Sequence, residues 1–142
     1  MVDDFTIRLG SWDALRDVAA SIRFTVFVSE QKVPEEIELD AMDPVSIHAL
    51  AYDAKGRAVG TGRLLPDGHI GRMAVLPAYR GAGVGTALLR ALMDEARSRG
   101  MRAVELHSQT QAAPFYRRMG FAEVSEEFYE AGIAHVTMRK DI

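Results

Sequence analysis

Small residues around three alternate glycines form the segment of this sequence whose composition and spacing best suit chemistry. The segment Arg80-Gly81-Ala82-Gly83-Val84-Gly85-Thr86 stands between the apolar run Met73-Ala74-Val75 and a helix-like pattern. The N-terminus of a helix presents backbone N–H groups without intrahelical partners and the positive end of the helix dipole. Glycines leave room for a ligand to approach that backbone. The spacing therefore predicts an anion cradle suited to a pyrophosphate, with Arg80 beside it.

The glycine pattern can be compared with three known nucleotide-binding motifs. A P-loop requires Gly-Lys-Ser/Thr, which does not follow these glycines, and the dinucleotide fingerprint requires a glycine where Thr86 stands. Gly81-x-Gly83-x-Gly85 does match the pattern of methyltransferases that use S-adenosylmethionine. That motif normally opens a doubly wound domain, whereas here it follows three strands of antiparallel character and lies past the middle of the chain. Its position therefore disfavours a methyltransferase.

Hydrophobic periodicity predicts the elements that must position this turn. Strands are expected over residues 5–9, 47–52, 58–65, 69–76, 103–107, 121–129 and 133–139, and helices over 12–28, 83–99 and 112–119. Residues 29–46 are expected to form a loop with room for one short helix. Asp67-Gly68 is a strong signal for a two-residue hairpin. The helix over 83–99 lies between the strands over 69–76 and 103–107, and such a crossover implies that these two strands are parallel. The order predicts an α/β (α+β mixed) fold, a mostly antiparallel sheet of about seven strands flanked by helices.

Two motifs in a defined order make this prediction more specific. Arg80-x-x-Gly83-x-Gly85, preceded by Val75-x-Pro77, resembles the coenzyme A signature of the GNAT superfamily of N-acetyltransferases. Phe115-Tyr116 and Gly120-Phe121 resemble a second motif of that superfamily. The resemblance covers nearly the whole chain. It implies a GNAT-like fold, a single domain over residues 1–142, and acetyl-CoA as cosubstrate without a metal.

Further segments resemble a small bacterial subgroup of the superfamily whose acceptor is unassigned. They are Val26-Phe27-Val28-x-Glu30-Gln31, Glu38-x-Asp40-x-x-Asp43, His48 and Glu130-Ala131-Gly132-Ile133-Ala134-His135. The chain departs from the subgroup at Gln111, where relatives tend to have histidine, and at Ala134, where they tend to have proline.

The resemblance implies that an amine attacks the thioester directly, without an acyl-enzyme. In GNAT folds a backbone N–H on the strand before the glycine turn stabilises the oxyanion, which by position falls to residues 73–75, with Val75 preferred. Residues 80–86 are expected to bind the cofactor. Tyr116 matches the tyrosine expected to hydrogen-bond the departing thiolate. The alternative for Tyr116 is a packing role beside its aromatic neighbours.

The base that deprotonates the amine is the least defined residue of the predicted site. Glu30 follows the apolar run Val26-Phe27-Val28, where apolar surroundings would raise the pKa of a carboxyl. The alternative is a solvated acid at a helix end. The other candidates are histidines, because imidazole titrates near neutral pH: His135, His48 and His107. The alternative for each of them is a hydrogen-bonded structural role.

Charged residues elsewhere suggest how an acceptor could be attracted. The acidic stretch Glu35-Glu36-x-Glu38-x-Asp40-x-x-Asp43 either draws a cationic amine to the acceptor side or is a solvated loop. Arg63 and Arg72 either contact phosphates or lie on strand surfaces. His69, beside the Asp67-Gly68 turn, is expected to be exposed.

Composition narrows the class of protein and its partners. The chain has 142 residues, a length typical of one domain, and it has no cysteine, which excludes thiolate metal ligands and a cysteinyl acyl-enzyme. A net charge of −3 gives no basic field for nucleic acid. Neither a secretory leader nor an apolar stretch of roughly 18 residues is apparent.

We therefore expect a cytoplasmic enzyme that acetylates an amine of a small molecule or a peptide, with neither nucleic acid nor membrane as a partner. A homodimer stays open. The alternatives are a module that binds acyl-CoA as a sensor without turnover, and a structural interaction domain.

Overall fold

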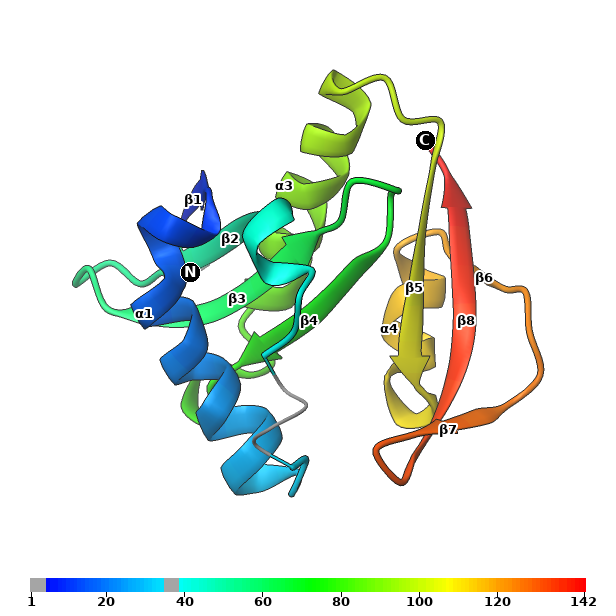
Figure 1. Cartoon of the computed structure of the whole chain (residues 1–142), viewed down its shortest axis with the longest axis horizontal. Helices are drawn as coiled ribbons and strands as arrows, with labels where there is room; N and C mark the ends of the chain where they lie inside the picture. Colours follow the sequence, from blue (N-terminus) through cyan, green and yellow to red (C-terminus); the bar gives the residue numbers. More distant parts are fainter. Residues whose placement is uncertain (1–4, 35–38) are drawn as a thin grey trace.

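The computed structural model describes residues 5–34 and 39–142, which contain two four-stranded sheets (Figure 1). In the first sheet, β1 (Thr6–Gly10), β2 (Ile47–Tyr52), β3 (Ala58–Leu64) and β4 (Ile70–Val75) lie in chain order, each antiparallel to the next. In the second, β8 (Ile133–Asp141) pairs antiparallel with β5 (Ala103–Gln109), β6 (Ala122–Glu123) and β7 (Phe128–Glu130). The α-helices are α1 (Trp12–Arg23), α3 (Val84–Ser98) and α4 (Ala113–Arg118). A π-helix, η1 (Phe24–Glu30), and the 3-10 turns η2 (Asp43–Val45), η3 (Pro77–Tyr79) and η4 (Thr110–Ala112) complete the described elements.

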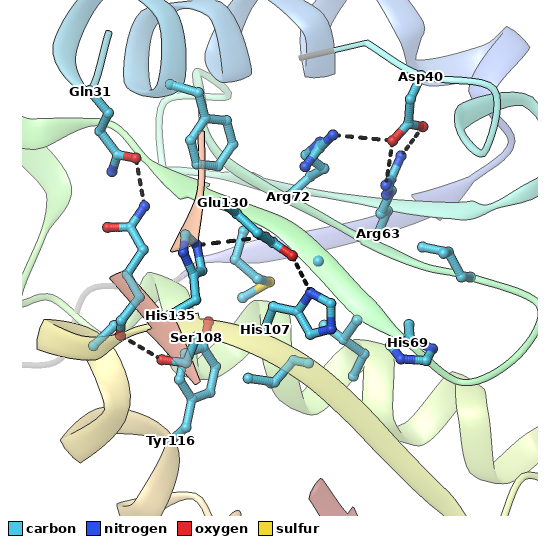
Figure 2. Close-up of a pocket in the computed structure, with 18 residues that line it drawn as sticks. Gln31, Asp40, Arg63, His69, Arg72, His107, Ser108, Tyr116, Glu130 and His135 are labelled. Atoms are coloured by element: carbon cyan, nitrogen blue, oxygen red, sulfur yellow. Dashed lines mark hydrogen bonds and ion pairs between the residues drawn. The ribbon is translucent and has the colours of Figure 1, made fainter. Parts of the chain in front are cut away.

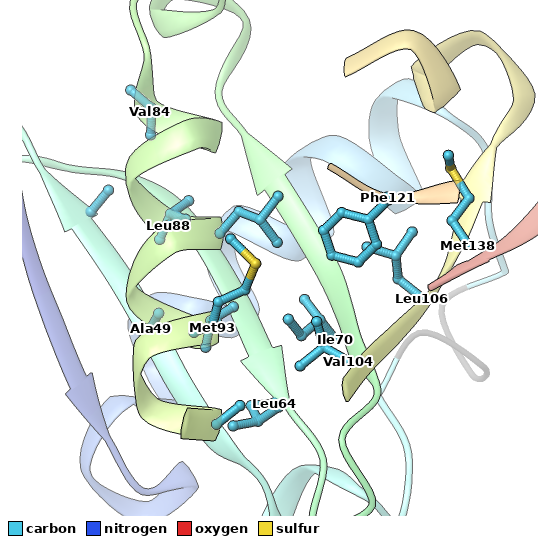
Figure 3. Close-up of a cluster of buried hydrophobic side chains, with 14 of the residues drawn as sticks. Ala49, Leu64, Ile70, Val84, Leu88, Met93, Val104, Leu106, Phe121 and Met138 are labelled. Carbon is cyan, nitrogen blue, oxygen red and sulfur yellow. The ribbon is translucent and has the colours of Figure 1, made fainter. Parts of the chain in front are cut away.

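Helices α1 and α3 cover opposite faces of the first sheet. Successive residues of a strand point to opposite faces, and in β2 Leu50 packs with α1, whereas Ala49 and Ala51 pack with α3. The α3 side holds the larger core, which extends to Val104 and Leu106 of β5 in the second sheet (Figure 3). The two sheets therefore share one apolar core behind the strands.

One isolated parallel bridge, between His69 and Glu105, joins the backbones of the two sheets. The Glu105 N–H donates to the Gly68 carbonyl at 3.2 Å, and beyond this point β4 and β5 diverge (Figure 1). The predicted mixed fold is confirmed, with eight strands among the described residues. The turn between β3 and β4 is longer than the expected two-residue hairpin, because the Leu65 N–H donates to the His69 carbonyl at 2.8 Å and leaves three residues, 66–68, in the loop. The parallel pair expected from the crossover is reduced to this bridge, so the sheet divides in two.

A bulge in β4 accompanies the divergence. Thr61 pairs with Ala74 but Arg63 pairs with Gly71, so two β4 residues stand opposite one β3 residue. One of the two is Arg72, a non-glycine residue with a φ of 50°. An extra residue of this kind bends a strand and increases its twist.

The first predicted helix changes its hydrogen-bond pattern before it ends. It was expected to run to about residue 28, but the α-helix ends at Arg23 and continues as a π-helix to Glu30. The Gln31 N–H donates to the Val26 carbonyl, five residues earlier, at 3.0 Å. The wider turn sets Phe27 and Gln31 in the wall of the cavity described below.

The strand predicted over residues 121–129 is interrupted. The Val124 N–H still donates to the Thr137 carbonyl at 2.9 Å, but the Thr137 N–H donates to the hydroxyl of Ser125 at 2.9 Å. A side chain replaces the backbone as acceptor at this rung, which divides the strand into β6 and β7. The final hairpin closes as predicted, with Ala131 and Gly132 both at positive φ, 50° and 76°.

Candidate active site

A cavity of about 430 Å³ opens where β4 and β5 diverge (Figure 2). Strand residues of both sheets line it, together with Tyr116 of α4 and Phe27 of η1. The Gln109 Nε2 donates to Gln31 Oε1 at 2.7 Å, which links the end of β5 to the end of η1. A second cavity of about 290 Å³ shares much of this lining and reaches the β7–β8 hairpin.

Strand register gathers the polar side chains of the second sheet on one face. His107 and Gln109 are alternate residues of β5, and Gln109 pairs with His135 of β8. His135 also pairs with Phe128 of β7, two residues before Glu130. Because paired and alternate strand residues share a face, their side chains project to the same side, where the polar ones line the cavity.

Glu130 lies between two imidazoles (Figure 2). Its Oε1 is 2.5 Å from His107 Nδ1, and its Oε2 is 3.8 Å from His135 Nε2. His135 Nδ1 donates to the Ile133 carbonyl at 2.7 Å. The predicted base His135 thus reaches the cavity, but its side chain is only 10% exposed, against 42% for His107.

His69 also faces this group, contrary to the expectation of a merely exposed residue. Its ring centroid is 5.9 Å from that of His107, edge to face, and its side chain lines the cavity. The Asp67-Gly68 signal correctly places His69 beside a turn. The direction of its side chain, however, depends on contacts with β5, which is remote in sequence.

His48 lies away from the cavity. It is buried, its Nε2 bonds with the Asp43 carbonyl at 2.9 Å, and its ring lies 4.7 Å from that of Trp12. Burial lowers the pKa of His48, with the hydrogen bond to Asp43 acting in the opposite direction. We interpret His48 as a structural residue, not a base.

The acidic stretch is an ion-pair network where the structure describes it. Asp43 Oδ1 accepts from Arg23 Nη1 and Arg63 Nη1, both at 2.8 Å, and the carboxyl is 1% exposed. Asp40 accepts from Arg63 at 2.7 Å and from Arg72 at 3.1 Å. The hydrogen bond from Arg63 lowers the pKa of Asp40 to about 2. Burial raises the pKa of Asp43, but the contacts with Arg23 outweigh it, so this pKa is also lowered.

These contacts change the predicted role of the stretch. Asp40 and Asp43 are neutralised by arginines and do not present net negative charge to an amine. Glu35, Glu36 and Glu38 lie outside the described residues. Arg63 and Arg72 line the cavity, a position that neither of the two predicted alternatives included.

The glycine turn has the geometry of an open cradle. Gly81 and Gly83 have φ values of 80° and 90°, and a Cβ on either would meet no atom within 4 Å. The first backbone bond of α3 runs from the Ala87 N–H to the Gly83 carbonyl at 3.1 Å, so the preceding N–H groups of the turn have no intrahelical acceptor. No side chain caps this helix, whereas the hydroxyl of Ser11 caps α1. Space, dipole and N–H donors therefore fit a pyrophosphate.

Other turn residues have packing roles as well. Val84 is buried, and a Cβ on Gly60 of β3 would lie 2.9 Å from its Cγ1. Gly85 has room for a Cβ, which would lie 3.6 Å from Cζ of Phe115 in α4. Only the backbone of Val84 is therefore available to a ligand.

Arg80 and Glu30 form an ion pair beside the turn. Arg80 Nη1 and Nη2 each donate to one Glu30 oxygen at 2.7 Å, and Nε donates to the Val75 carbonyl at 3.0 Å. The hydrogen bond from Arg80 lowers the pKa of Glu30. Of the two alternatives for Glu30, the raised pKa is thus contradicted, because a guanidinium, rather than the preceding apolar run, is the dominant neighbour.

The backbone of Val75 points away from the first sheet. Val75 stands opposite Gly60, while the adjacent Leu76 N–H donates to the Val59 carbonyl at 2.9 Å. Hydrogen-bonded and non-hydrogen-bonded pairs alternate in an antiparallel ladder, so the N–H and carbonyl of Val75 face the diverging side. The Arg80 contact with that carbonyl has the same direction.

Tyr116 lines the cavity from α4. Its ring packs edge to face with Phe115 and Phe121, at centroid distances of 5.0 and 5.9 Å. Burial raises the pKa of Tyr116 to about 12. Tyr116 thus packs in the expected aromatic cluster and also lines the cavity.

Glu130 is the functional candidate that the sequence reading missed. Its position in a hairpin turn next to Ala131-Gly132 indicated only a turn. The signal that could have identified it is the two-residue spacing from Phe128, which sets its side chain on the face of His135.

Neither a metal centre nor a membrane-spanning helix is present among the described residues, 5–34 and 39–142. No group of three or more His, Asp and Glu side chains among them could hold a metal ion. No helix among them is long and apolar enough to cross a membrane.

Three comparisons with known proteins return the same kind of domain. Residues 15–142 match the family model described as "Acetyltransferase (GNAT) domain". The chain is 42% identical over 133 residues to a Bacillus subtilis protein described as the uncharacterized N-acetyltransferase YjcF, across 91% of this chain and 94% of that protein. The structure of an acyl-CoA N-acyltransferase from Pseudomonas aeruginosa superposes with a TM-score of 0.80 at 33% identity, over 97% of this chain and 99% of that one. Escherichia coli ElaA superposes with a TM-score of 0.84 at 25% identity, over 96% and 99%.

Proposed function

Because the chain belongs to the GNAT family of acetyltransferases, enzymes that use acetyl-CoA as cosubstrate, we propose that it transfers the acetyl group directly to an amine of a small molecule or a peptide. The observation that carries this proposal is the divergence of β4 and β5. The glycine turn follows the end of β4, while the polar cavity opens between the two strands. A thioester between them would be accessible to an amine from the cavity.

The glycine turn and the edge of β4 would bind the cosubstrate. The N–H groups at the start of α3 and the positive end of its dipole would hold the pyrophosphate. The Val75 N–H, which faces the diverging side, would donate to the thioester oxygen as negative charge develops on it. The strand edge would pair with the amide groups of the pantetheine arm as it would with an extended peptide.

The reaction forms one C–N bond and breaks one C–S bond. An ammonium group first loses a proton to a base, and the free amine attacks the thioester carbon. The tetrahedral intermediate then expels the thiolate, the nitrogen loses its second proton as the amide forms, and the thiolate takes up a proton. A phenol with a pKa of about 12 is too weak an acid to protonate a thiolate of pKa ~8.5 fully. Tyr116 would therefore stabilise the leaving group by donating a hydrogen bond.

Steady-state kinetics test direct transfer. The chain has no cysteine, and the amine in this proposal attacks the bound thioester itself. Double-reciprocal plots for acetyl-CoA and an amine should then intersect. Parallel lines, or an isolable acetyl-enzyme, would show a covalent intermediate instead.

An amine screen tests whether transfer occurs at all. Acetyl-CoA-dependent thiol release is measured across small primary amines and short peptides, and the acetylated product is identified by mass spectrometry. We expect amine-dependent release with at least one class. Tight CoA binding with no amine-dependent release across the screen would favour a binding module without turnover.

A further inference from the structure

The contact between Glu130 and His107 defines which nitrogen of the histidine carries a proton. His107 Nδ1 lies 2.5 Å from Glu130 Oε1. An ionised carboxylate only accepts hydrogen bonds, so the proton of this contact is on Nδ1. In the neutral ring, Nε2 then keeps its lone pair. A carboxylate that fixes a histidine in this tautomer is the arrangement that prepares an imidazole to accept a proton from a substrate.

The neighbours of His107 hold the ring and leave the side chain accessible. Phe128 and His69 both pack edge to face with it, at centroid distances of 5.2 and 5.9 Å. The side chain is 42% exposed and lines the cavity. A small amine can therefore reach the ring, and water can take the proton away afterwards.

The other candidate bases are less suited by their contacts. His135 donates through Nδ1 to a carbonyl, and its Nε2 faces Glu130 rather than the open cavity. His48 is buried and bonded to the Asp43 carbonyl. Glu30 is held by two hydrogen bonds from Arg80. His107 is the candidate that combines a fixed tautomer with access.

We propose that His107 is the general base and that Glu130 is the residue that positions it, for acceptors that are alkyl ammonium ions at neutral pH. The inference rests on the proposed acetyl transfer. Nε2 takes one proton from the ammonium nitrogen, whose electron pair then attacks the thioester. The resulting imidazolium donates from Nδ1 to the ionised Glu130, and this charge-assisted contact stabilises it.

Turnover measured with two different nucleophiles distinguishes a base at His107 from a structural role of this residue. n-Butylamine is mostly protonated at pH 7 and requires a base, whereas hydroxylamine is mostly neutral and requires much less help. In His107→Gln the amide can still donate to Glu130, but it cannot accept a proton. We expect its kcat/KM for n-butylamine to fall about a hundredfold or more, with a much smaller fall for hydroxylamine and an unchanged KM for acetyl-CoA.

Glu130→Ala should show the same selective loss to a smaller extent, because the base remains but its tautomer is no longer fixed. The control is Glu123→Gln, which removes the charge of a glutamate of β6 whose exposed side chain accepts from Arg117 of α4. It should leave turnover of both nucleophiles unchanged. Equal losses for both nucleophiles in His107→Gln would indicate a structural role, and full activity with n-butylamine would exclude the base.

Nitrogen NMR of the histidine rings tests the inference without an acceptor. The wild-type ring of His107 should show the Nδ1–H tautomer, and Glu130→Ala should give a mixture. An Nε2–H tautomer in the wild type would overturn the inference. If the wild type releases no thiol with either nucleophile or with any amine or peptide of the screen while the Nδ1–H tautomer is present, it is the proposed transfer to amines that fails.

Discussion

The two sides of the diverging strands differ in the groups that they offer to a ligand: backbone N–H groups on one side and side chains on the other. On the side of α3, the candidate contacts are backbone N–H groups of a short continuous segment, and Gly81 and Gly83 keep the space before them open. On the acceptor side, the contacts are side chains from elements far apart in the chain. The 2.5 Å contact between His107 Nδ1 and Glu130 Oε1 joins β5 to β7. Arg63 of β3 contacts both Asp40 and Asp43, which precede it by at least twenty residues.

This difference has a physical consequence. A backbone cradle depends on local conformation, so it tolerates changes in side chains that do not enter its space. The part of the other side that is built on the buried contacts of Asp43 with Arg23 and Arg63 depends on every partner, because removing one charge leaves another desolvated and unpaired. In the proposed reaction, a short motif would bind the cosubstrate, while binding of the acceptor would depend on a set of tertiary contacts.

The largest expected effect is on the acceptor side. Asp43→Asn removes a carboxylate that is 1% exposed and contacts both Arg23 and Arg63. Breaking a buried pair in this way typically costs about 3–5 kcal/mol. We expect a loss of this order in the free energy of unfolding, measured by urea denaturation.

Glu123→Gln provides the comparison, since Arg117 and Glu123 form an exposed pair. Exposed pairs contribute at most about 1 kcal/mol. If Asp43→Asn were no more destabilising than this control, the network would not support the acceptor side, and the contrast between the two sides would disappear.

The sequence predicted the elements because their signals are local. Periodicity located β2, β3 and α3 within a residue or two, and Gly100 ends α3 with a φ of 81° as expected of the residue after a helix. The division into two sheets was not predictable in this way. It accompanies a bulge at Arg72 and a single bridge between the two sheets, at His69 and Glu105. Neither feature changes the hydrophobic periodicity of the sequence.

In the candidate site, too, the features with local signals could be predicted and those that depend on distant residues could not. The glycine turn could be predicted because glycine spacing and the start of a helix lie in one segment. The sequence around Glu30 left the direction of its pKa open, because the residue that lowers this pKa, Arg80, is fifty residues away. Glu130 was missed for a related reason, since its contact with His107 requires the register of both β7 and β5 on β8.

The second prediction concerns the leaving group. Tyr116→Phe deletes only the hydroxyl and keeps the ring beside Phe115 and Phe121. If the hydroxyl donates to the thiolate, kcat should fall roughly ten- to a thousandfold, about 1.4–4 kcal/mol in the barrier, with little change in the KM for acetyl-CoA. A lower melting temperature with near-normal turnover would instead mean that the residue only packs.

The third prediction tests the cradle itself. Gly81→Ala places a methyl group in open space where the phosphates would lie, and we expect CoA affinity to fall at least about tenfold. Gly100→Ala is the matched control, because Gly81 and Gly100 have φ values of 80° and 81° and neither Cβ would meet an atom within 4 Å. Both variants carry the same backbone strain of about 1–2 kcal/mol, so calorimetry with CoA should separate ligand space from strain. Equal CoA affinities would exclude the turn as the phosphate site.

The fourth prediction uses acid to probe the network. The pKa of Asp40 is about 2 in the folded chain, below its ordinary value of 3.8. A lowered folded pKa contributes stability that is present above pH 3.8 and is lost as the pH falls through about 2. The unfolding free energy of the wild type should therefore decrease across this window, and Asp40→Asn should decrease less steeply. Equal slopes would mean that Asp40 titrates alike in both states.

The smallest expected effect is at the boundary between the two sides, where Glu30 holds Arg80. Both side chains are about two-fifths exposed, so Glu30→Gln should change stability by less than about 1 kcal/mol. The same substitution removes a carboxylate that competes with a pyrophosphate for the guanidinium. CoA affinity should therefore rise about two- to fivefold at low ionic strength, and salt should reduce the gain. A base at Glu30 predicts the opposite pattern: unchanged CoA affinity and a fall in kcat of a hundredfold or more. Calorimetry at two salt concentrations, with turnover measured on the same preparation, distinguishes a cofactor-side ion pair from a catalytic carboxylate.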